Sequence, residues 1–499
     1  MGHLQKSTVS LNAGFLKWTA LTPGQPRHLP PDPPQDQHKD KIACFGRQSA
    51  VFLDGLPPAG ADYEPRESIT KKLRRLIQVH SWTAAFERAI STVSSQNLPE
   101  LDRIRTLEQF YFLIDAMVTW IPELRIWEWH GTVYHERTDY LRITQFYYYF
   151  VQPDLLALQS PVDPHAGSSL SPLSLWLREY AIDYGKFLDT PASVGRLETY
   201  KYASEYAYQD FNGGEDGISG YRSFNDWFCR TFKQIDLQRP VAQPENPRII
   251  AFPAESTFVG QWAIGSSEAE ALTKPSSIIV KHVEWPIPTL LKDSAYAHDF
   301  EGGVMIQCFL NVNDYHRQHA PASGTILEAR FIPGQVYMDV GLQACDPEER
   351  HPVGPANEVM SYPHLEALDP TGFQFLQCRG LFVLQTAIGK IAVLPVGMAQ
   401  VSSVVFVKPG SDELIRLSQE EQRALSYEEQ VDLLNARIQS EVVGKSVRKG
   451  DMMTSFLFGG SDLVMVFERQ SKVNVTAMVG RHYPVRSQLA TSSIEHLLV

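Results

Sequence analysis

The chain has 499 residues, which is enough for two or three domains with a sizeable hydrophobic core. Its apolar, aromatic and charged fractions of 43%, 11% and 20% are those of an ordinary globular protein. The formal net charge of −12 argues against a general nucleic-acid or anionic-membrane surface, because both favour basic patches.

Targeting and redox features indicate a soluble cytoplasmic protein. No apolar run approaches the length of a transmembrane helix, so we expect no integral membrane segment. Residues 1–24 lack the apolar core of a secretory signal. The five cysteines are odd in number and scattered, with no Cys-x-x-Cys pair. This usage indicates reduced thiols and not a disulfide framework or a zinc site.

Apolar spacing divides the first part of the chain into a tail and a helical domain. Residues 1–65 contain few periodic apolar residues and five prolines between Pro26 and Pro34, which predicts an extended or disordered tail. Helical spacing begins near Ser68 and recurs from Ile104 to Ile121 and from Leu173 to Tyr184. We therefore predict a helical domain over residues 66–205.

Two aromatic patches lie inside this helical region, at Trp127–Trp129 and at Phe146–Phe150. Aromatic side chains of this density can simply fill the core of a helical domain. Alternatively, some of them line a pocket for a flat substrate. The sequence leaves both interpretations open.

The remaining residues, 206–499, change in texture to short β-like runs separated by glycine and proline. The acidic segment Ser418–Leu434 has helical character, and we predict a solvated surface insertion there. The fold class expected is therefore α+β, with a helical N-terminal domain followed by a β-rich domain. The predicted strands are 249–252, 304–312, 326–332, 381–385, 391–395, 401–407, 463–467 and 473–479.

Ahead of the apolar run 463–467 stands the sequence Phe458-Gly459-Gly460-Ser461-Asp462. Taken alone, Gly-Gly-Ser predicts a turn. Two glycines can also adopt the dihedral angles that a strained scissile bond requires, and a serine hydroxyl can attack the carbonyl carbon that precedes it.

Two histidines and one glutamate are further candidates for chemistry. His316 and His319 would share one face of a helix and could bind a metal, but their flanks predict a strand running into a turn. Since no third ligand with metal-site spacing is evident, we predict no metal site. Core hydrogen bonds could equally satisfy both imidazoles. Glu255 ends a strand-like run; it is either a solvated loop carboxylate or the acid that orients an imidazole.

In combination, these stretches resemble the phosphatidylserine decarboxylase family. The resemblance covers about Tyr221 to the C-terminus, and its motifs follow the family's order. The motifs are FNDWFCR (224–230), Arg239-Pro240, Pro253-Ala254-Glu255, Phe300-Glu301-Gly302-Gly303, DYHRQHAPASG (314–324), IPGQVY (332–337), VRKGD (447–451) and FGGS (458–461). The DYHRxHxPxxG run and the GGS before an apolar strand are the specific parts.

The resemblance implies a proenzyme that cuts itself between Gly460 and Ser461 and converts residue 461 into a covalent pyruvoyl cofactor. It implies that His319, oriented by Glu255, is the base for self-cleavage, and that His316 is a proton donor or substrate contact. The fragments 1–460 and 461–499 would stay associated. A substrate amine would form a Schiff base with the pyruvoyl carbonyl, which would then accept electrons as carbon dioxide leaves.

The chain departs from the family pattern in two respects. Glu255 stands where the family usually has Asp, and a long helical extension replaces the apolar N-terminal anchor of the membrane-bound members. The second departure resembles the noncanonical soluble fungal branch, typified by tryptophan decarboxylase, which acts on free amino acids. This implies a small-molecule substrate, an aromatic L-amino acid and most specifically L-tryptophan, and a role in secondary metabolism. The alternative substrate is phosphatidylserine, with phosphatidylethanolamine as the product.

Two other classes of protein remain to be distinguished. A serine hydrolase could use Ser461, His319 and Glu255 without self-cleavage, although no G-x-S-x-G elbow surrounds Ser461. A non-cleaving homologue that acts as a binding module is the other alternative. Either would remain a single chain on a denaturing gel.

Overall fold

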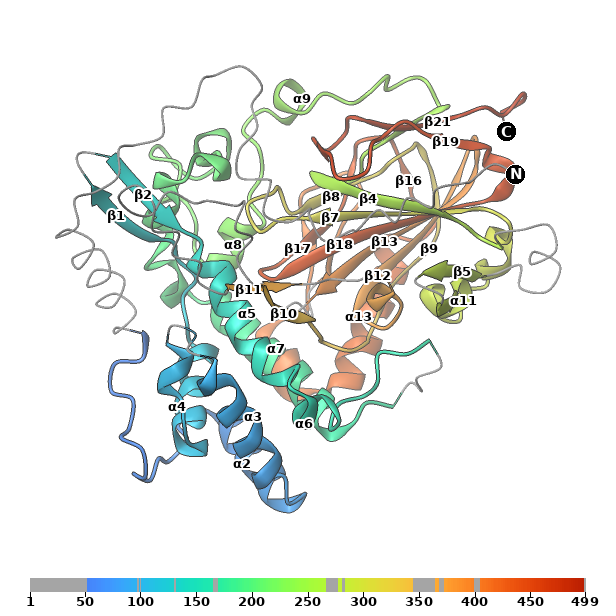
Figure 1. The fold of residues 1–499 in the computed structure, drawn as a ribbon. Coiled ribbons are helices and arrows are strands. Elements are labelled where there is room, and N and C mark those ends of the chain that lie inside the picture. The colour runs from blue at the N-terminus through green and yellow to red at the C-terminus, as the bar shows by residue number, and fades with distance from the viewer. Residues whose placement is uncertain are drawn as a thin grey trace, which may run out of the picture. The chain divides into compact units, whose positions relative to one another are not determined.

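A computed structural model describes residues 52–96, 98, 100–129, 132–164, 169–265, 277–280, 283–343, 364–367, 372–398 and 404–497 (Figure 1). All of these residues belong to one contact unit. Most of the predicted tail, residues 1–51, lies outside the described residues, and the domain boundaries at residues 65 and 205 stay predictions.

Helices make up the first part of the described chain, as the apolar spacing predicted. The second of the predicted helical stripes starts later than expected, because Thr106 caps a helix that begins at Leu107. Its hydroxyl accepts the backbone N–H of Gln109, whose side chain caps Thr106 in return. Within the described ranges, no helix is long and apolar enough to cross a membrane. The helices are α2 (Ser68–Val79), α3 (Thr83–Ser95), α4 (Leu107–Val118), α5 (Thr138–Phe150), α6 (Pro153–Leu156) and α7 (Pro172–Leu188).

Aromatic side chains from α5 and α7 fill the core of this helical region. The rings of Phe146 and Tyr180 stack with centroids 4.3 Å apart, and Phe150 packs on Trp176 at 5.7 Å. The core interpretation of the patch 146–150 is therefore correct. The other patch, Trp127–Trp129, lies on strand β1 (Arg125–Trp129), which pairs with β2 (Thr132–Glu136) in a hairpin that the sequence did not predict.

The β-rich part is built on an eight-stranded sheet with the order β16-β9-β12-β13-β18-β7-β4-β20, in which every neighbouring pair is antiparallel. The α+β fold class is confirmed. Its strands are β4 (Ser256–Ala263), β7 (Val304–Leu310), β9 (Gly324–Ile332), β12 (Arg379–Thr386), β13 (Gly389–Met398), β16 (Ser446–Val447), β18 (Gly460–Phe467) and β20 (His482–Tyr483).

Smaller sheets surround this one (Figure 1). A four-stranded sheet has the order β15-β14-β17-β8, a three-stranded sheet has the order β19-β21-β3, and two hairpins pair β10 with β11 and β5 with β6. Their strands are β3 (Ile249–Ala251), β5 (Ser277–Val280), β6 (Val283–Pro286), β8 (Arg317–His319), β10 (Val340–Gln343), β11 (His364–Ala367), β14 (Val404–Val407), β15 (Leu414–Ile415), β17 (Met452–Phe456), β19 (Val473–Val475) and β21 (Gln488–Ser492).

The acidic segment predicted as a surface insertion is more integrated than expected. It forms α12 (Gln419–Ala424) and α13 (Tyr427–Glu441), each begun by a serine capping box. Asn435 of α13 makes hydrogen bonds with both the backbone N–H and the carbonyl of Phe331 in β9. Ile438 is fully buried against the sheet. The sequence prediction missed this packing because charged residues dominate α13 and only a narrow apolar stripe anchors the helix to the sheet. Shorter helices of the β-rich part are α8 (Phe224–Phe228), α9 (Ile235–Gln238) and α11 (Ile287–Leu291).

Phe458, two residues before β18, joins the helical core to the β-rich part. Its ring lies 5.1 Å from that of Phe224 and 5.3 Å from that of Phe228, both in α8. It also lies 6.4 Å from the rings of Trp120 and Tyr184. All four contacts bury the side chain, which is 2% exposed. The segment ahead of Ser461 is thus anchored by the helical region.

We predict that Phe458→Ala lowers the free energy of unfolding by about 3–5 kcal/mol, because the ring leaves a cavity among rigid aromatic neighbours. Chemical denaturation measures this change. Leu237→Ala is the matched control, since Leu237 is 77% exposed and its truncation should alter stability by less than about 0.5 kcal/mol. Equal effects of the two substitutions would contradict the anchoring role of Phe458.

Candidate active site

The predicted scissile bond lies at the start of β18. The turn predicted for Gly-Gly-Ser ends earlier than expected, because Gly460 and Ser461 already belong to the strand. Gly459 has φ of 152°, a conformation that a side chain would strain. Ser461 pairs with Gly397 of β13 on one side and with Leu310 of β7 on the other. The peptide between Gly460 and Ser461 is therefore fixed within a paired sheet, one residue after a glycine whose φ suits glycine alone.

The hydroxyl of Ser461 is buried and has no hydrogen-bond partner among the described residues. Since side chains alternate along a strand, Ser461 shares a face with Leu463 and Met465. Those residues pack in the cluster that contains Ala320 and Phe456. This face is therefore the one near the DYHRQHAPASG segment. A buried hydroxyl without a partner fits a nucleophile and precursor of a pyruvoyl group, and Ser461 itself would carry that group.

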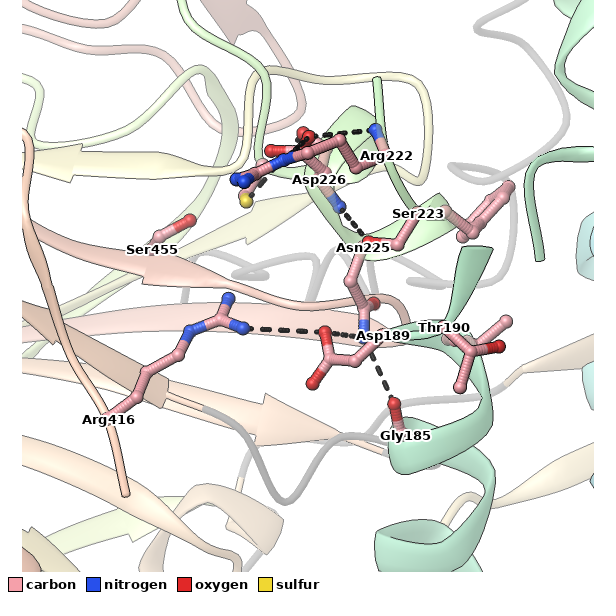
Figure 2. A network of polar contacts seen from close by, with 12 residues as sticks. Gly185, Asp189, Thr190, Arg222, Ser223, Asn225, Asp226, Arg416 and Ser455 are labelled. Atoms are coloured by element: carbon pink, nitrogen blue, oxygen red, sulfur yellow. Dashed lines mark hydrogen bonds and ion pairs between the residues drawn. The ribbon is translucent and has the colours of Figure 1, made fainter. Parts of the chain in front are cut away.

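Asn225 holds the segment that precedes the scissile bond. Its Oδ1 accepts the backbone N–H of Phe458 at 3.1 Å. Figure 2 shows its amide pointing at α7, where Nδ2 donates to Oδ1 of Asp189 at 3.0 Å and to the carbonyl of Gly185 at 3.3 Å. Asp189 also contacts Arg416 at 3.4 Å. This network ties the backbone of Phe458 to the helical region through a side chain that is 1% exposed.

His319 is a buried imidazole with both ring nitrogens engaged. Nδ1 lies 2.8 Å from the carbonyl oxygen of Gly450 and must donate to it, because a carbonyl can only accept. Nε2 lies 3.1 Å from the hydroxyl of Tyr315 and is left as the basic atom. Burial, with the charge of Arg486, lowers the pKa of His319 to about 3. The imidazole is therefore neutral at ordinary pH, with the lone pair of Nε2 available, although its low pKa makes it a weaker base than a free imidazole.

The structure does not make the hydrogen bond that we predicted between Glu255 and His319. Arg239 donates to both carboxylate oxygens of Glu255, at 2.7 and 2.5 Å. The ring nitrogens of His319 have their own partners, so the carbonyl of Gly450 does the orienting that we expected of Glu255. The reason is geometric: a planar guanidinium matches both oxygens of one carboxylate.

His316 is also buried, but it differs from His319 in having neither ring nitrogen hydrogen-bonded within the described part of the chain. Its ring stacks on that of Phe228, with centroids 3.9 Å apart. Burial, followed by the positive charge of Arg230, lowers the pKa of His316 well below its ordinary value. The expectation that core hydrogen bonds satisfy both histidines thus holds for His319 and is wrong for His316.

Sequence reasoning missed a second histidine–carboxylate pair. Nε2 of His482 lies 2.9 Å from Oδ1 of Asp314, whose other oxygen accepts the backbone N–H of Asn311. His482 is part of β20, at the edge of the main sheet. It follows Ser461 by only 21 residues, yet no motif marks it, and only the antiparallel pairing of β20 with β4 brings it to Asp314.

Asp462, next to the scissile bond, is a fully buried carboxyl. Its Oδ2 accepts hydrogen bonds from the amides of Gln307 and Gln374, at 2.8 and 2.5 Å. Burial raises the pKa of Asp462 to about 7, against the lowering effect of these two amides. Because side chains alternate along a strand, the carboxyl of Asp462 lies on the face of β18 opposite to Ser461.

A cavity of about 190 Å³ opens beside the anchored segment. Its walls include Ile182 of α7, Tyr427 of α13, Phe331 of β9 and the adjacent residues Leu457 and Phe458. The aromatic patch 146–150 does not contribute to its lining.

Comparison with known proteins shows the family of this chain. The model of the family named phosphatidylserine decarboxylase matches residues 224–490, more than half of the chain. The matched range contains Ser461, both histidines of the DYHRQHAPASG segment, and Glu255. The chain belongs to the phosphatidylserine decarboxylase family.

Individual relatives carry two different names. The chain is 28% identical to L-tryptophan decarboxylase of Psilocybe cubensis over 37% of its own length and 39% of the relative's. It is 27% identical to phosphatidylserine decarboxylase proenzyme 3 of Schizosaccharomyces pombe over 58% of its length and 23% of the relative's. With a phosphatidylserine decarboxylase proenzyme from Anaeromyxobacter it shares 27% identity, over 50% and 70% of the two chains. The matches thus span less than half of the first two relatives.

We predict that stability falls as pH rises from about 4 to about 7, because the unfolded carboxyl of Asp462 ionises near pH 4 while the folded one stays protonated to about pH 7. The slope contributed is at most about 1.4 kcal/mol per pH unit. Asp462→Asn should remove this contribution. Denaturation in a Ser461→Ala chain measures it without interference from cleavage. The control is Asp432→Asn on the exposed side of α13; an unchanged pH slope in Asp462→Asn would contradict the assignment.

Proposed function

We propose that this protein is a self-cleaving, pyruvoyl-dependent decarboxylase that acts on a free aromatic L-amino acid, with L-tryptophan as the first candidate. The observation that carries the proposal is the buried, unpartnered hydroxyl of Ser461 directly after two glycines, of which Gly459 has a φ of 152°. Family membership and the Psilocybe tryptophan decarboxylase relatives support the reaction class and the substrate.

Self-cleavage begins when His319 removes the proton of the Ser461 hydroxyl, whose oxygen attacks the carbonyl carbon of Gly460. The peptide bond breaks, leaving an ester and a free amine on residue 461. Elimination then releases the carboxylate of Gly460 and leaves dehydroalanine, which water converts to the pyruvoyl group with loss of ammonia. In this scheme the Gly450 carbonyl holds the imidazole of His319, and Glu255 acts on Arg239.

The pyruvoyl group, once formed, supplies an electron sink for loss of the substrate carboxylate. His316, neutral and without hydrogen bonds, contacts the substrate or returns a proton to its α carbon. The ring of Phe228, which stacks on His316 and packs against Phe458 in turn, excludes water from that face of the imidazole. The two fragments stay associated because β18 is paired on both sides, with β13 and β7, and β21 is paired with β3.

Phosphatidylserine is the second candidate substrate, supported by the proenzyme relatives. A non-cleaving homologue that serves as a binding module is the alternative outside catalysis. The cytoplasmic location stays a prediction from the sequence.

We predict that the purified protein migrates as a large fragment and a piece of about 4 kDa, the 39 residues from 461 to 499. Ser461→Ala should remain one chain and release no carbon dioxide. Gel electrophoresis and the mass of the small fragment's first residue test cleavage. Carbon dioxide release from aromatic amino acids and from phosphatidylserine tests the substrate. A cleaved and active Ser461→Ala protein would refute the mechanism.

We predict that His319→Gln slows self-cleavage by about 10²–10⁴-fold, because the variant keeps a hydrogen bond to Gly450 but loses the basic Nε2. Fragment formation is followed over time on a denaturing gel. Glu255→Gln is the comparison: it should act through Arg239 and slow cleavage much less. If Glu255→Gln were the slower of the two, the predicted direct role of Glu255 would be restored.

A further inference from the structure

Arg230, the last residue of the FNDWFCR segment, has a guanidinium whose hydrogen-bonding capacity is only partly used. Its Nη2 donates to the carbonyl oxygens of Asn313 and Asp314, at 2.9 and 3.3 Å. Nε and Nη1 have no partner in the described ranges, although the residue is only 2% exposed. Nε and Nη1 belong to different edges of the guanidinium, so Arg230 has two separate free donors in a buried place.

The carboxylates closest in charge interaction to Arg230 are already engaged. Asp314 accepts from His482 and from its own loop, and Glu255 accepts twice from Arg239. The rings of Phe211 and Trp227, 4.4 and 4.9 Å from the guanidinium carbon, give some compensation through their π electrons. A buried cation whose donors are unmet is costly unless an anion joins it. The Arg230 guanidinium thus lacks a paired anion among the described residues.

His316 adjoins the same place. The carbonyls that Arg230 holds belong to the two residues immediately before Tyr315-His316, and Phe228, two residues before Arg230, stacks on the His316 ring. Neither ring nitrogen of His316 has a hydrogen-bond partner among the described residues. Two neighbouring side chains with unmet polar atoms, enclosed by aromatic rings, form a small polar site.

We propose that the free donors of Arg230 bind the α-carboxylate of the substrate, next to His316. This inference rests on the proposed function, since it concerns the substrate of that reaction. A guanidinium N–H donates a strong, charge-assisted hydrogen bond to a carboxylate oxygen. The chemistry is shared by a free amino acid and by the serine headgroup of a lipid, so the proposal does not depend on which of them is the substrate.

The arrangement also explains how His316 could gain and lose a proton. Arg230 disfavours the charged imidazole, and a bound carboxylate offsets that charge and lets His316 be protonated. When the bond to the carboxylate breaks and carbon dioxide leaves, its electron pair stays with the α carbon. The guanidinium again opposes the imidazolium, which passes its proton to that carbon.

The test compares ligands that differ only in the carboxylate. L-tryptophan is compared with tryptamine, and phospho-L-serine with phosphoethanolamine, by titration calorimetry. Binding is measured in the Ser461→Ala chain and in mature protein whose carbonyl has been reduced with borohydride, so that no turnover occurs. We expect one of the two carboxylated ligands to bind more tightly than the matching amine that lacks the carboxylate. Arg230→Gln should lower the affinity for that carboxylated ligand by about 10- to 100-fold and change the affinity for the matching amine by less than about twofold.

Arg317→Gln is the matched control, because Arg317 is also a buried arginine of this region but its donors reach the Cys229 carbonyl and the Met452 sulfur. It should leave the ratio of the two affinities unchanged. Arg230→Lys keeps the charge and should retain part of the preference, which serves if Arg230→Gln does not fold. Equal binding of both members of each pair, absence of binding by all four ligands, or equal weakening of both members by Arg230→Gln would overturn the proposal.

The two proposals fail separately. A wild-type protein that stays uncleaved refutes the proposed maturation. In that case the preference for carboxylated ligands can still be measured in the Ser461→Ala chain. A cleaved wild-type protein without carboxylate preference in either form refutes only the role of Arg230.

Discussion

The segment around the predicted scissile bond is held from both sides, and the structure around it depends on that constraint. Before the bond, the backbone N–H of Phe458 is bound by Asn225 and its ring is packed among four aromatic rings. After the bond, β18 is hydrogen-bonded between β13 and β7. Gly459, with φ of 152°, connects the two, in a conformation that favours glycine.

Polar groups in the interior of this protein fall into two kinds. Most have partners, as with Lys449, whose ammonium donates to three carbonyls, and Asn435, which bonds a neighbouring strand through both amide atoms. By contrast, the hydroxyl of Ser461, the ring of His316 and two donors of Arg230 have none among the described residues, and the same holds for several buried tyrosine hydroxyls of the helical core. An unmet buried polar group destabilises the folded state and calls for an explanation; for Ser461, His316 and Arg230 the explanation that we propose is chemistry.

The helical region supports the site and is not merely attached to it. Helix α7 supplies Tyr180 to the aromatic core, Asp189 follows its end, and Gly185 offers a carbonyl to Asn225. Folding of α7 and positioning of Phe458 are therefore coupled through Asn225 and through the direct contact of Phe458 with Tyr184. The same helix lines the cavity beside Leu457 and Phe458. This coupling gives a physical role to an N-terminal region that the family model does not cover.

The sequence by itself determined the fold class and the family, because these depend on local spacing and on short motifs. It located the helices near Ser68 and at Leu173–Tyr184 and the strand before Phe467, since apolar periodicity is a local property. It could not determine partners. Whether Glu255 faces His319 or Arg239, and whether His482 meets Asp314, depends on strand register and on loops distant in the chain. Only tertiary structure decides those pairings, because a carboxylate binds whichever cation the fold brings to it.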